Sequence, residues 1–346
     1  MHIIAKFRQK LNSPAQNTTL LSKIFSVTED NFRAIALELF RYQYQHNPVY
    51  NQYCNTLQAD IDKINTIEKI PFLPISFFKT HTIVTTDFTP EAVFESSGTT
   101  GTINSRHFVK DIGLYKESFT RGFELFYGNP TDWCILALLP SYIERNNSSL
   151  VVMADELIKR SAHSLSSFYL DDREKLFNTL TQLEQQQQKT LLLGVTFALL
   201  DFAEQYTLPL AHTIIMETGG MKGRRKEITR EEVHNILCNR FLLPAIHSEY
   251  GMTELLSQAY SKTNGSFNCP PWMKILIRDE DDPLTIHSTA RNNPVTGAIN
   301  IIDLANIYSC AFIATDDAGK LFSNGHFEVL GRIDNSDIRG CSLLSL

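Results

Sequence analysis

Two hydrophobic periodicities divide the chain into regions of different predicted structure. Within residues 1–80, large apolar side chains recur at the three- and four-residue spacing of one helix face. These positions are Phe32, Ile35, Leu39 and Tyr42. Ser26 and Glu29 stand ahead of this run with the spacing of a capping box. The pattern predicts a mostly helical N-terminal segment.

From about residue 81, short β-rich runs alternate with amphipathic segments. Strands are expected at Thr82–Thr85, Ala92–Phe94, Trp133–Leu138, Leu191–Val195 and Thr213–Met216. Helices are expected near Asp111–Phe126, Ser148–Arg160, Asp171–Gln188 and Thr229–Arg240. Thr229 and Glu232 form a second capping-box pattern. This alternation is typical of βαβ units, and it predicts an α/β core with a largely parallel sheet over residues 81–260.

The pattern changes again after Tyr260, where short apolar runs are separated by Pro, Gly and Asp. Strands are expected at Lys274–Ile277, Ala298–Ile302, Ala311–Thr315 and His326–Leu330. Residues 261–346 are therefore predicted to form a smaller β-rich subdomain. The expected fold class is α/β, with mixed, mostly parallel sheets flanked by helices.

Composition and charge narrow the class of protein. The 346 residues are 43% hydrophobic and 20% charged, as in folded globular proteins. A net charge of -6 gives no basic excess for a nucleic-acid partner. Charged residues interrupt the N-terminus, and no apolar run approaches the roughly 20 residues that span a bilayer. The six cysteines include no CxxC pair, and HExxH is absent, so no zinc site is indicated. We expect a cytoplasmic protein without a membrane span.

A loop rich in glycine and hydroxyl side chains follows one predicted strand. Its sequence is Glu95-Ser-Ser-Gly-Thr-Thr-Gly101, and such a loop can surround phosphate oxygens with N–H and O–H donors. A polar hairpin turn would use the same residues. The patterns GxxxxGK[ST], GxGxxG and GxSxG are absent, which removes P-loop, simple Rossmann and serine-hydrolase interpretations.

A second glycine turn ends the strand predicted at Thr213–Met216. It belongs to Glu217-Thr-Gly-Gly-Met-Lys-Gly-Arg-Arg-Lys226, at the edge of a sheet where α/β proteins bind ligands. The glycine pair would let a flat ring approach the backbone, and three cations could face an anion: Lys222, Arg224 and Arg225. For Lys226 and Arg230 a solvated, charged helix start is the favoured interpretation.

Two further segments carry suitable groups. His247-Ser-Glu-Tyr-Gly-Met-Thr-Glu254 offers an aromatic ring, a glycine, a hydroxyl and a carboxylate, the groups needed to stack a base, admit a substrate carbonyl and hold Mg²⁺. His247 by itself is more simply structural. Thr315-Asp-Asp-Ala-Gly319 precedes Gly331-Arg-Ile-Asp-Asn-Ser-Asp-Ile-Arg-Gly340. A turn carboxylate such as Asp317 would suit two ribose hydroxyls.

The order of these motifs resembles that of the AMP-forming adenylating enzymes, which include acyl-CoA synthetases and luciferases. The resemblance implies ATP and Mg²⁺ as cofactors. It implies a phosphate loop at Ser97, Thr99, Thr100 and Gly101, and an adenine site at Gly219, Gly220 and Tyr250. It further implies an α-phosphate contact at Thr253, a Mg²⁺ ligand at Glu254, a ribose site at Asp317 and Arg332, and a hinge at Asp334.

Residues 30–346 look closer still to the LuxE-type acyl-protein synthetases. This resemblance rests on four sequence segments: Leu139-Pro-Ser-Tyr-Ile-Glu-Arg145, Glu217-Thr-Gly-Gly-Met-Lys-Gly-Arg224, Ser248-Glu-Tyr-Gly-Met-Thr-Glu254 and Ile338-Arg-Gly-Cys-Ser-Leu343. The resemblance implies activation of a fatty acid as acyl-AMP, its capture as a thioester on Cys341, and delivery to a partner acyl reductase. A tail from Asp334 to Cys341 could reach about 25 Å when extended. The catalytic residues are then Cys341, Thr253 and Glu254, the other five cysteines are structural, and a homo-oligomer stays open.

The sequence also departs from the adenylating pattern. Thr102-Ile-Asn-Ser-Arg106 stands where those enzymes usually have Pro-Lys, and the lysine of their C-terminal domain has no counterpart. Either another cation replaces it (Arg106, Lys222 or Arg224), or the protein accepts activated acyl groups. Two alternatives stay open: a CoA ligase similar to phenylacetate-CoA ligases, and a non-catalytic nucleotide- or acyl-binding subunit of a fatty-acid reductase complex.

Overall fold

One large twisted sheet organises the molecule. The computed structural model describes residues 14–96, 103–140, 147–219, 228–287 and 293–333. Within these ranges, twelve strands follow one another in the order β12-β11-β13-β14-β15-β10-β9-β8-β7-β6-β4-β5, and β1 pairs with β14 from outside this path. A separate two-stranded sheet joins β2 (Ala92–Glu95) to β3 (Arg106–Val109).

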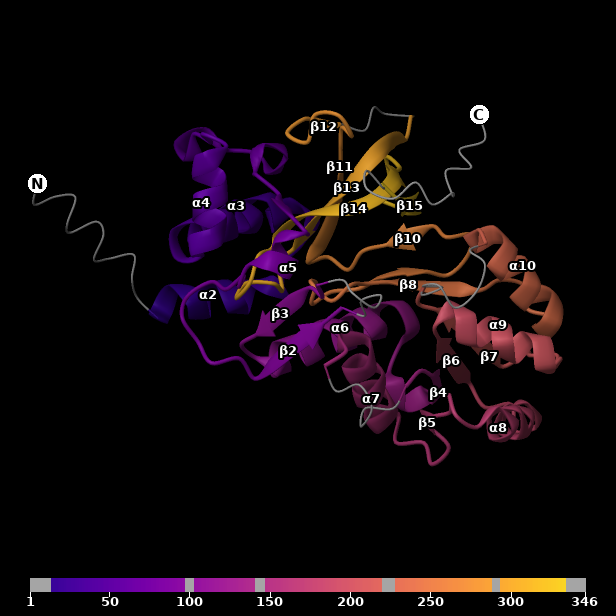
Figure 1. Ribbon diagram of the computed structural model, residues 1–346. Helices are drawn as coiled ribbons and strands as arrows, with labels where there is room; N and C mark the ends of the chain where they lie inside the picture. The colour runs from indigo at the N-terminus through magenta and orange to yellow at the C-terminus, as the bar shows by residue number, and fades with distance from the viewer. Residues whose placement is uncertain (1–13, 97–102, 141–146, 220–227, 288–292, 334–346) are drawn as a thin grey trace, which may run out of the picture.

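One half of the large sheet is parallel. Its strands are β4 (Cys134–Leu138), β5 (Ser167–Phe168), β6 (Thr190–Gly194), β7 (Thr213–Glu217) and β8 (His247–Tyr250). The helices that alternate with them are α6 (Ile112–Tyr127), α7 (Ser149–Ser161), α8 (Arg173–Gln185), α9 (Thr196–Gln205) and α10 (Arg230–Phe241). β4 and β6 are buried along their whole length, because helices cover both faces (Figure 1).

Alternate residues of these strands enter two different cores. Leu136 and Leu192 pack with the apolar side chains of α8, α9 and α10. Ile135 and Leu193 belong to the larger core, which also contains α6 and α7. The two-residue period of a strand thus assigns each helix layer its own set of contacts.

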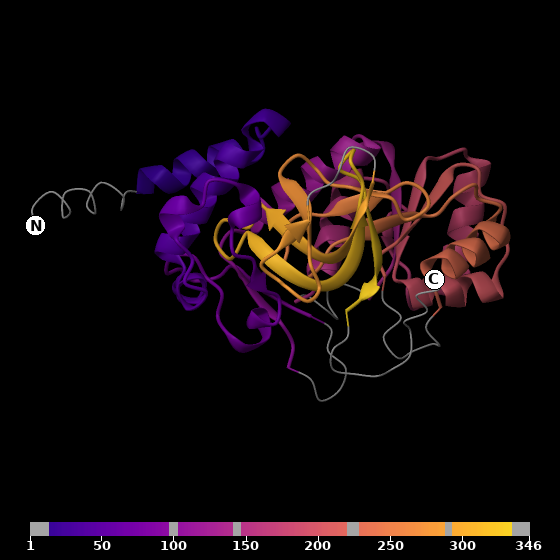
Figure 2. The same cartoon turned by 90° about the horizontal axis from the view of Figure 1, so that it is seen from above.

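The other half of the sheet is antiparallel. Its strands are β9 (Ala259–Ser261), β10 (Phe267–Asn268), β11 (Met273–Arg278), β12 (Ile286–His287), β13 (Val295–Asp303), β14 (Phe312–Leu321) and β15 (Phe327–Arg332). The N-terminal elements are α2 (Pro14–Ile24), α3 (Glu29–His46), α4 (Pro48–Thr56), β1 (Leu73–Pro74) and α5 (Phe77–Thr80). Short 3-10 turns lie between α4 and β1, at Ile61–Lys63 and Ile67–Lys69, and a third, Pro130–Asp132, lies between α6 and β4. Figure 2 shows the yellow antiparallel strands between the indigo N-terminal helices and the salmon layer that contains α8–α10.

An aromatic cluster joins the N-terminal helices to the antiparallel strands. Phe40, Tyr50 and Phe72 each lie about 6 Å, ring centre to ring centre, from Phe312 on β14. The Gln43 amide, itself buried, donates to the carbonyls of residues 306, 307 and 309. The helical N-terminal region is therefore packed into the core.

The structure confirms the mixed α/β class, and it corrects several local predictions. Thr82–Thr85 forms no strand; Thr85 instead hydrogen-bonds to the Tyr308 and Ser309 carbonyls. The first capping box is formed by Thr28 with Asn31, not by Ser26 with Glu29. α9 was not expected. β14 continues through residues 316–321, so Asp317 lies in a strand and not in a turn. The divisions after residues 80 and 260 stay predictions.

Candidate nucleotide and acyl site

Three of the predicted nucleotide-binding residues meet between β8, β14 and β15. The Tyr250 hydroxyl donates to Asp317 Oδ2 over 2.8 Å, and Arg332 Nε lies 3.7 Å from Asp317 Oδ1. Burial raises the pKa of the Asp317 carboxyl, while Tyr250 and Arg332 act in the opposite direction. The Arg332 side chain is 72% exposed, so this carboxyl lies at the edge of an accessible surface. A carboxylate in this setting can accept from two adjacent hydroxyls.

The predicted adenine turn is held by the strand that precedes it. Gly219 has φ +72, a conformation that favours glycine, and its N–H donates to Glu217 Oε2 over 2.8 Å. The same oxygen accepts from the Thr196 hydroxyl over 3.0 Å, and the Thr196 N–H donates to the Gly219 carbonyl. Hydrogen bonds therefore hold both the N–H and the carbonyl of Gly219 at the carboxyl end of β7.

The charged carboxylate of Glu217 is almost completely buried. Its other oxygen, Oε1, lies 3.5 Å from Arg230 Nε and 3.7 Å from His234 Nε2. Burial alone would raise the pKa of this carboxyl; His234, Arg230, the Gly219 N–H and Ser248 outweigh it and lower the pKa to about 2. Glu217 is therefore ionised throughout the physiological range.

Arg230 begins α10, as expected, but its side chain is not simply solvated. Its guanidinium lies 5.2 Å from the centre of the Phe267 ring, and Nη1 donates to the Val329 carbonyl over 3.0 Å. Because it also faces Glu217, Arg230 joins the end of β7 to β15, the strand that carries Arg332. Lys226 lies outside the described residues.

Thr253 and Glu254 follow β8 and are held through their backbone. His107 Nδ1, on β3, lies 2.9 Å from the Thr253 carbonyl, and Asn306 Nδ2 donates to the Glu254 carbonyl over 2.7 Å. A carbonyl only accepts, so the His107 proton is on Nδ1. Burial lowers the pKa of His107 to about 4, which keeps the ring neutral at pH 7. The backbone of both residues is thereby held in a fixed position after β8.

Glu254 has the properties of a Mg²⁺ ligand. Its side chain is buried, and burial raises the pKa of its carboxyl, while Ser105, Arg332 and Lys79 act weakly against this. A cation would remove the cost of ionising it. Mg²⁺ is commonly held by one or two carboxylates together with substrate phosphates, so a single carboxylate fits. Among the described residues, no group of three or more Asp, Glu, His or Cys side chains could hold a metal alone.

The stem of the predicted phosphate loop approaches Glu254. The Ser96 N–H donates to the Ser105 carbonyl, and the Ser105 N–H donates to the Ser96 hydroxyl. Ser105 is also near enough to Glu254 to lower the pKa of its carboxyl, against the effect of burial. The loop itself lies outside the described residues, as do six other predicted positions: Gly220, Lys222, Arg224, Arg225, Asp334 and Cys341.

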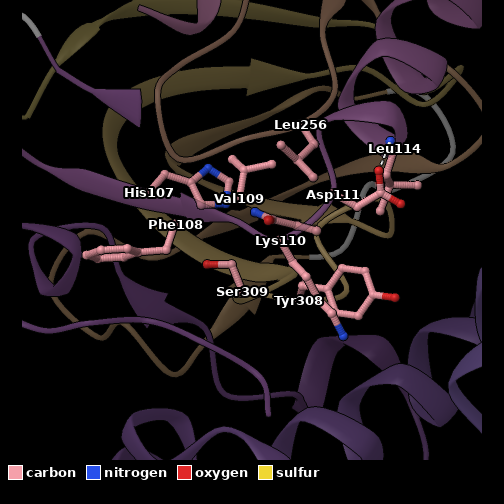
Figure 3. A pocket seen from close by; sticks show the side chains of 10 residues that line it. His107, Phe108, Val109, Lys110, Asp111, Leu114, Leu256, Tyr308 and Ser309 are labelled. Atoms are coloured by element: carbon pink, nitrogen blue, oxygen red, sulfur yellow. Dashed lines mark hydrogen bonds between the residues drawn. The ribbon is translucent and has the colours of Figure 1, made fainter. Parts of the chain in front are cut away.

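A small pocket lies beside the loop that follows β8 (Figure 3). It is lined by His107, Lys110, Leu256 and Tyr308, among others, and Lys110 Nζ lies 4.3 Å from the centre of the Tyr308 ring. Its volume of about 10 Å³ is about that of a single water probe. It therefore cannot hold a nucleotide or an acyl chain.

Sequence reasoning missed the residues that hold the site together. The sequence presents Glu217 only as the first residue of a motif, and it carries no local signal for His107, Thr196 or Asn306. A charged residue ending a completely apolar strand is a usable signal, because such a charge requires partners. The other three contact backbone atoms from distant parts of the chain, which no local pattern reveals.

Comparison with solved structures identifies the fold. The fold is that of the adenylate-forming enzymes. ATP-bound MatB from Rhodopseudomonas palustris is similar with a TM-score of 0.52 and 16% identity, over 70% of this chain and 48% of MatB. An ATP-bound MatB–BclM chimera matches with a TM-score of 0.52 and 17% identity, over 70% and 47%. The chain thus spans about half the length of these structures.

The chain belongs to the LuxE acyl-protein synthetase family, whose model matches residues 19–345. The resemblance inferred from the motifs is therefore confirmed, and it extends over more of the chain than the motifs indicated. No curated protein matches the sequence. Of the residues that the structure describes, none belong to a helix with the length and apolar character needed to cross a membrane.

Proposed function

We propose that this protein uses ATP and Mg²⁺ to activate a carboxylic acid as an acyl adenylate and transfers the acyl group to a thiol. The observation that carries the proposal is the Tyr250–Asp317 hydrogen bond, since it joins two motifs far apart in the sequence. β7 and β8 are adjacent and parallel, so the Gly219 turn lies at the same sheet edge. Adenine and ribose contacts are thus available side by side.

The nucleotide is bound through groups that are already fixed. Gly219 offers an open face to the base, because nothing among the described residues lies within 4 Å of where a Cβ would stand, while Glu217 and Thr196 hold its N–H and its carbonyl. Asp317 accepts from the ribose hydroxyls, and Arg332 stays beside it. These partners are already in position when ATP binds, so little reorganisation is needed. They therefore stabilise the charge that develops in the transition state better than water would.

The first chemical step is attack by the substrate carboxylate on the α-phosphorus of ATP. A P–O bond to the acid forms, the bond to the β-phosphate oxygen breaks, and pyrophosphate leaves. Thr253 contacts the α-phosphate, and Glu254 would hold Mg²⁺. When bound, Mg²⁺ neutralises charge on the leaving pyrophosphate. His107 and Asn306 support this step indirectly, because they keep residues 253 and 254 in place.

The second step is attack by a thiolate on the acyl carbonyl. A C–S bond forms, the C–O bond to AMP breaks, and the thiol proton is lost to solvent. Family membership supports Cys341 as the acceptor, a fatty acid as the substrate and a partner acyl reductase as the destination. The described cysteines are less suited, since Cys54, Cys134 and Cys310 are buried. Burial raises the pKa of the Cys54 thiol to about 12 and that of Cys134 to about 11.

The acceptor is tested by incubating the protein with ATP, Mg²⁺ and radiolabelled fatty acid. We expect protein-bound label that hydroxylamine releases, as a thioester requires. Cys341→Ser should abolish this label and still form acyl-AMP, whereas Cys238→Ser, a control at a partly exposed cysteine, should retain it. Label that survives Cys341→Ser contradicts the assignment, and ATP-dependent formation of acyl-CoA would favour the CoA-ligase alternative.

A further inference from the structure

The face of β8 opposite the nucleotide contacts carries a set of polar groups that the proposed reaction does not use. Ser248 and Tyr250 are buried, and Glu249 between them projects from the other face. On β9, Tyr260 is the direct partner of Glu249 in the ladder, and Gln258 lies two residues before it. Glu249, Gln258 and Tyr260 therefore share one surface, which α6 covers through contacts of Tyr127 with Tyr260.

The Glu249 carboxyl and the Gln258 side chain meet over Gly251. A Cβ placed on Gly251 would collide with Glu249 Oε1, and it would lie 3.3 Å from Gln258 Cγ. Gly251 is thus the residue that gives the Glu249 carboxyl room to lie against Gln258. Tyr260 stands directly opposite Glu249 in the ladder, so the three residues form a cluster on one face at the carboxyl end of β8.

Two atoms of this cluster are buried without a hydrogen-bond partner. They are Gln258 Oε1 and Tyr260 Oη, and their side chains are 5% and 1% exposed. A buried polar atom without a partner costs about 1–3 kcal/mol. The Glu249 side chain is partly exposed. Among the described residues, no hydrogen bond or ion pair to its carboxyl is found. A buried acceptor and a buried hydroxyl donor are therefore left unsatisfied, beside a carboxyl that has no protein partner among the described residues.

Resting on the proposed function, we propose that Glu249, Gln258 and Tyr260 form a subsite that selects a carboxylic acid carrying a hydroxyl group. A hydroxyl is both donor and acceptor, so it can donate to Gln258 Oε1 and accept from the Tyr260 hydroxyl or the Glu249 carboxyl. An unsubstituted fatty chain would leave all three groups unpaired. Sites built to bind a hydroxyl discriminate strongly against analogues that lack it.

The surroundings of Glu249 keep its carboxyl in the donor form. Burial, together with the nearby charge of Glu217, raises its pKa to about 8. The titratable groups that face it are Tyr115 and Tyr127 from α6, Tyr260 from β9, and His247 from β8 itself. Burial lowers the pKa of His247 to about 4, so this ring adds no positive charge at pH 7. Glu249 is therefore neutral below about pH 8 and loses its proton above it.

The test compares matched acids: octanoate with 8-hydroxyoctanoate and 3-hydroxyoctanoate, and benzoate with 4-hydroxybenzoate. Binding is measured by calorimetry, and activation by acid-dependent exchange of pyrophosphate into ATP. We expect at least one hydroxylated acid to bind about tenfold more tightly than its parent or better. Tyr260→Phe and Glu249→Leu should bring this ratio close to one. Glu249→Gln should retain it, and should remove its decline above pH 8.

Tyr260→Phe keeps the ring packing and breaks no hydrogen bond, so its fold is expected to persist. Ratios near one in the unaltered protein, ratios unchanged in both variants, or no binding of any acid would overturn the subsite. Selective binding without exchange would instead contradict adenylate formation and leave the subsite supported. The two proposals therefore fail in different measurements.

Discussion

Replacing Glu217 by Gln removes one negative charge from the end of β7, beside the Gly219 turn, and changes the shape of the side chain little. The ordinary pKa of a glutamate is about 4.5, and the partners of Glu217 lower it to about 2. A difference of about 2.5 units corresponds to about 3 kcal/mol in favour of the charged form in the folded protein. We therefore expect Glu217→Gln to lower the free energy of unfolding by about 3 kcal/mol at pH 7.

The pH dependence of that difference has a definite sign. Because folding lowers the pKa of Glu217, its stabilising effect is complete above about pH 4.5 and is lost as the pH falls toward 2. The gap between the two proteins should be equal at pH 7 and pH 5, and should narrow by about 1 kcal/mol at pH 3.5. Urea unfolding at the three pH values measures it. Glu231→Gln, an exposed site on the same helix as Arg230, is the control and should cost little.

The same variant should bind AMP more weakly, because the Gly219 N–H and the Thr196 hydroxyl lose a charged acceptor. Affinity for pyrophosphate, which the turn does not contact in the proposed site, should be unchanged. Two results would refute the reasoning: a stability loss below about 0.5 kcal/mol, or an equal loss of affinity for AMP and pyrophosphate. Either would mean that Glu217 does not position the turn.

Two further predictions concern the site and its support. Tyr250→Phe removes the hydroxyl that donates to Asp317, so AMP affinity should fall roughly fivefold, the equivalent of about 1 kcal/mol, in a calorimetric titration. Unchanged affinity would show that this bond has no part in nucleotide binding. Gly194→Ala places a Cβ 2.8 Å from Leu199 Cγ and should lower the free energy of unfolding by about 1–3 kcal/mol in urea. Gly122→Ala, whose Cβ meets only an ordinary contact at 3.8 Å, should be neutral or stabilising, and an equal cost at both glycines would contradict the packing argument.

Hydrophobic periodicity predicted the regular part of the fold. The strands expected near β4, β6, β7, β11 and β13 are present, and the helix boundary at Thr229 with Glu232 is confirmed by the capping box of α10. These elements have strong local signals: apolar runs bounded by turns, and a capping pair. The apolar pattern does not separate α9 from β6, because only one residue lies between the two elements and their apolar residues form one continuous run.

The candidate site was likewise predictable from the sequence only in part. Motif order pointed to Tyr250 and Asp317, but their direct hydrogen bond depends on β14 passing beside β15 near the end of β8, which local sequence does not specify. The turn expected around Asp317 is a strand because residues 317–321 pair with β15, and residues 318–321 also pair with β13. Long-range pairing overrides the turn preference of Asp and Gly there. Glu217 and Arg230 could only be understood together, since Arg230 faces the buried charge of Glu217 from a different element.

Adenylate formation is the central claim, and the exchange of radiolabelled pyrophosphate into ATP tests it most directly. The account predicts exchange that requires both a carboxylic acid and Mg²⁺. The exchange should persist in Cys341→Ser, because the acceptor acts after pyrophosphate has left. It should be strongly reduced in Glu254→Gln, which retains the size of the side chain and removes the charge for the metal. Absence of exchange with every acid tried, by protein that still binds ATP, would contradict the account.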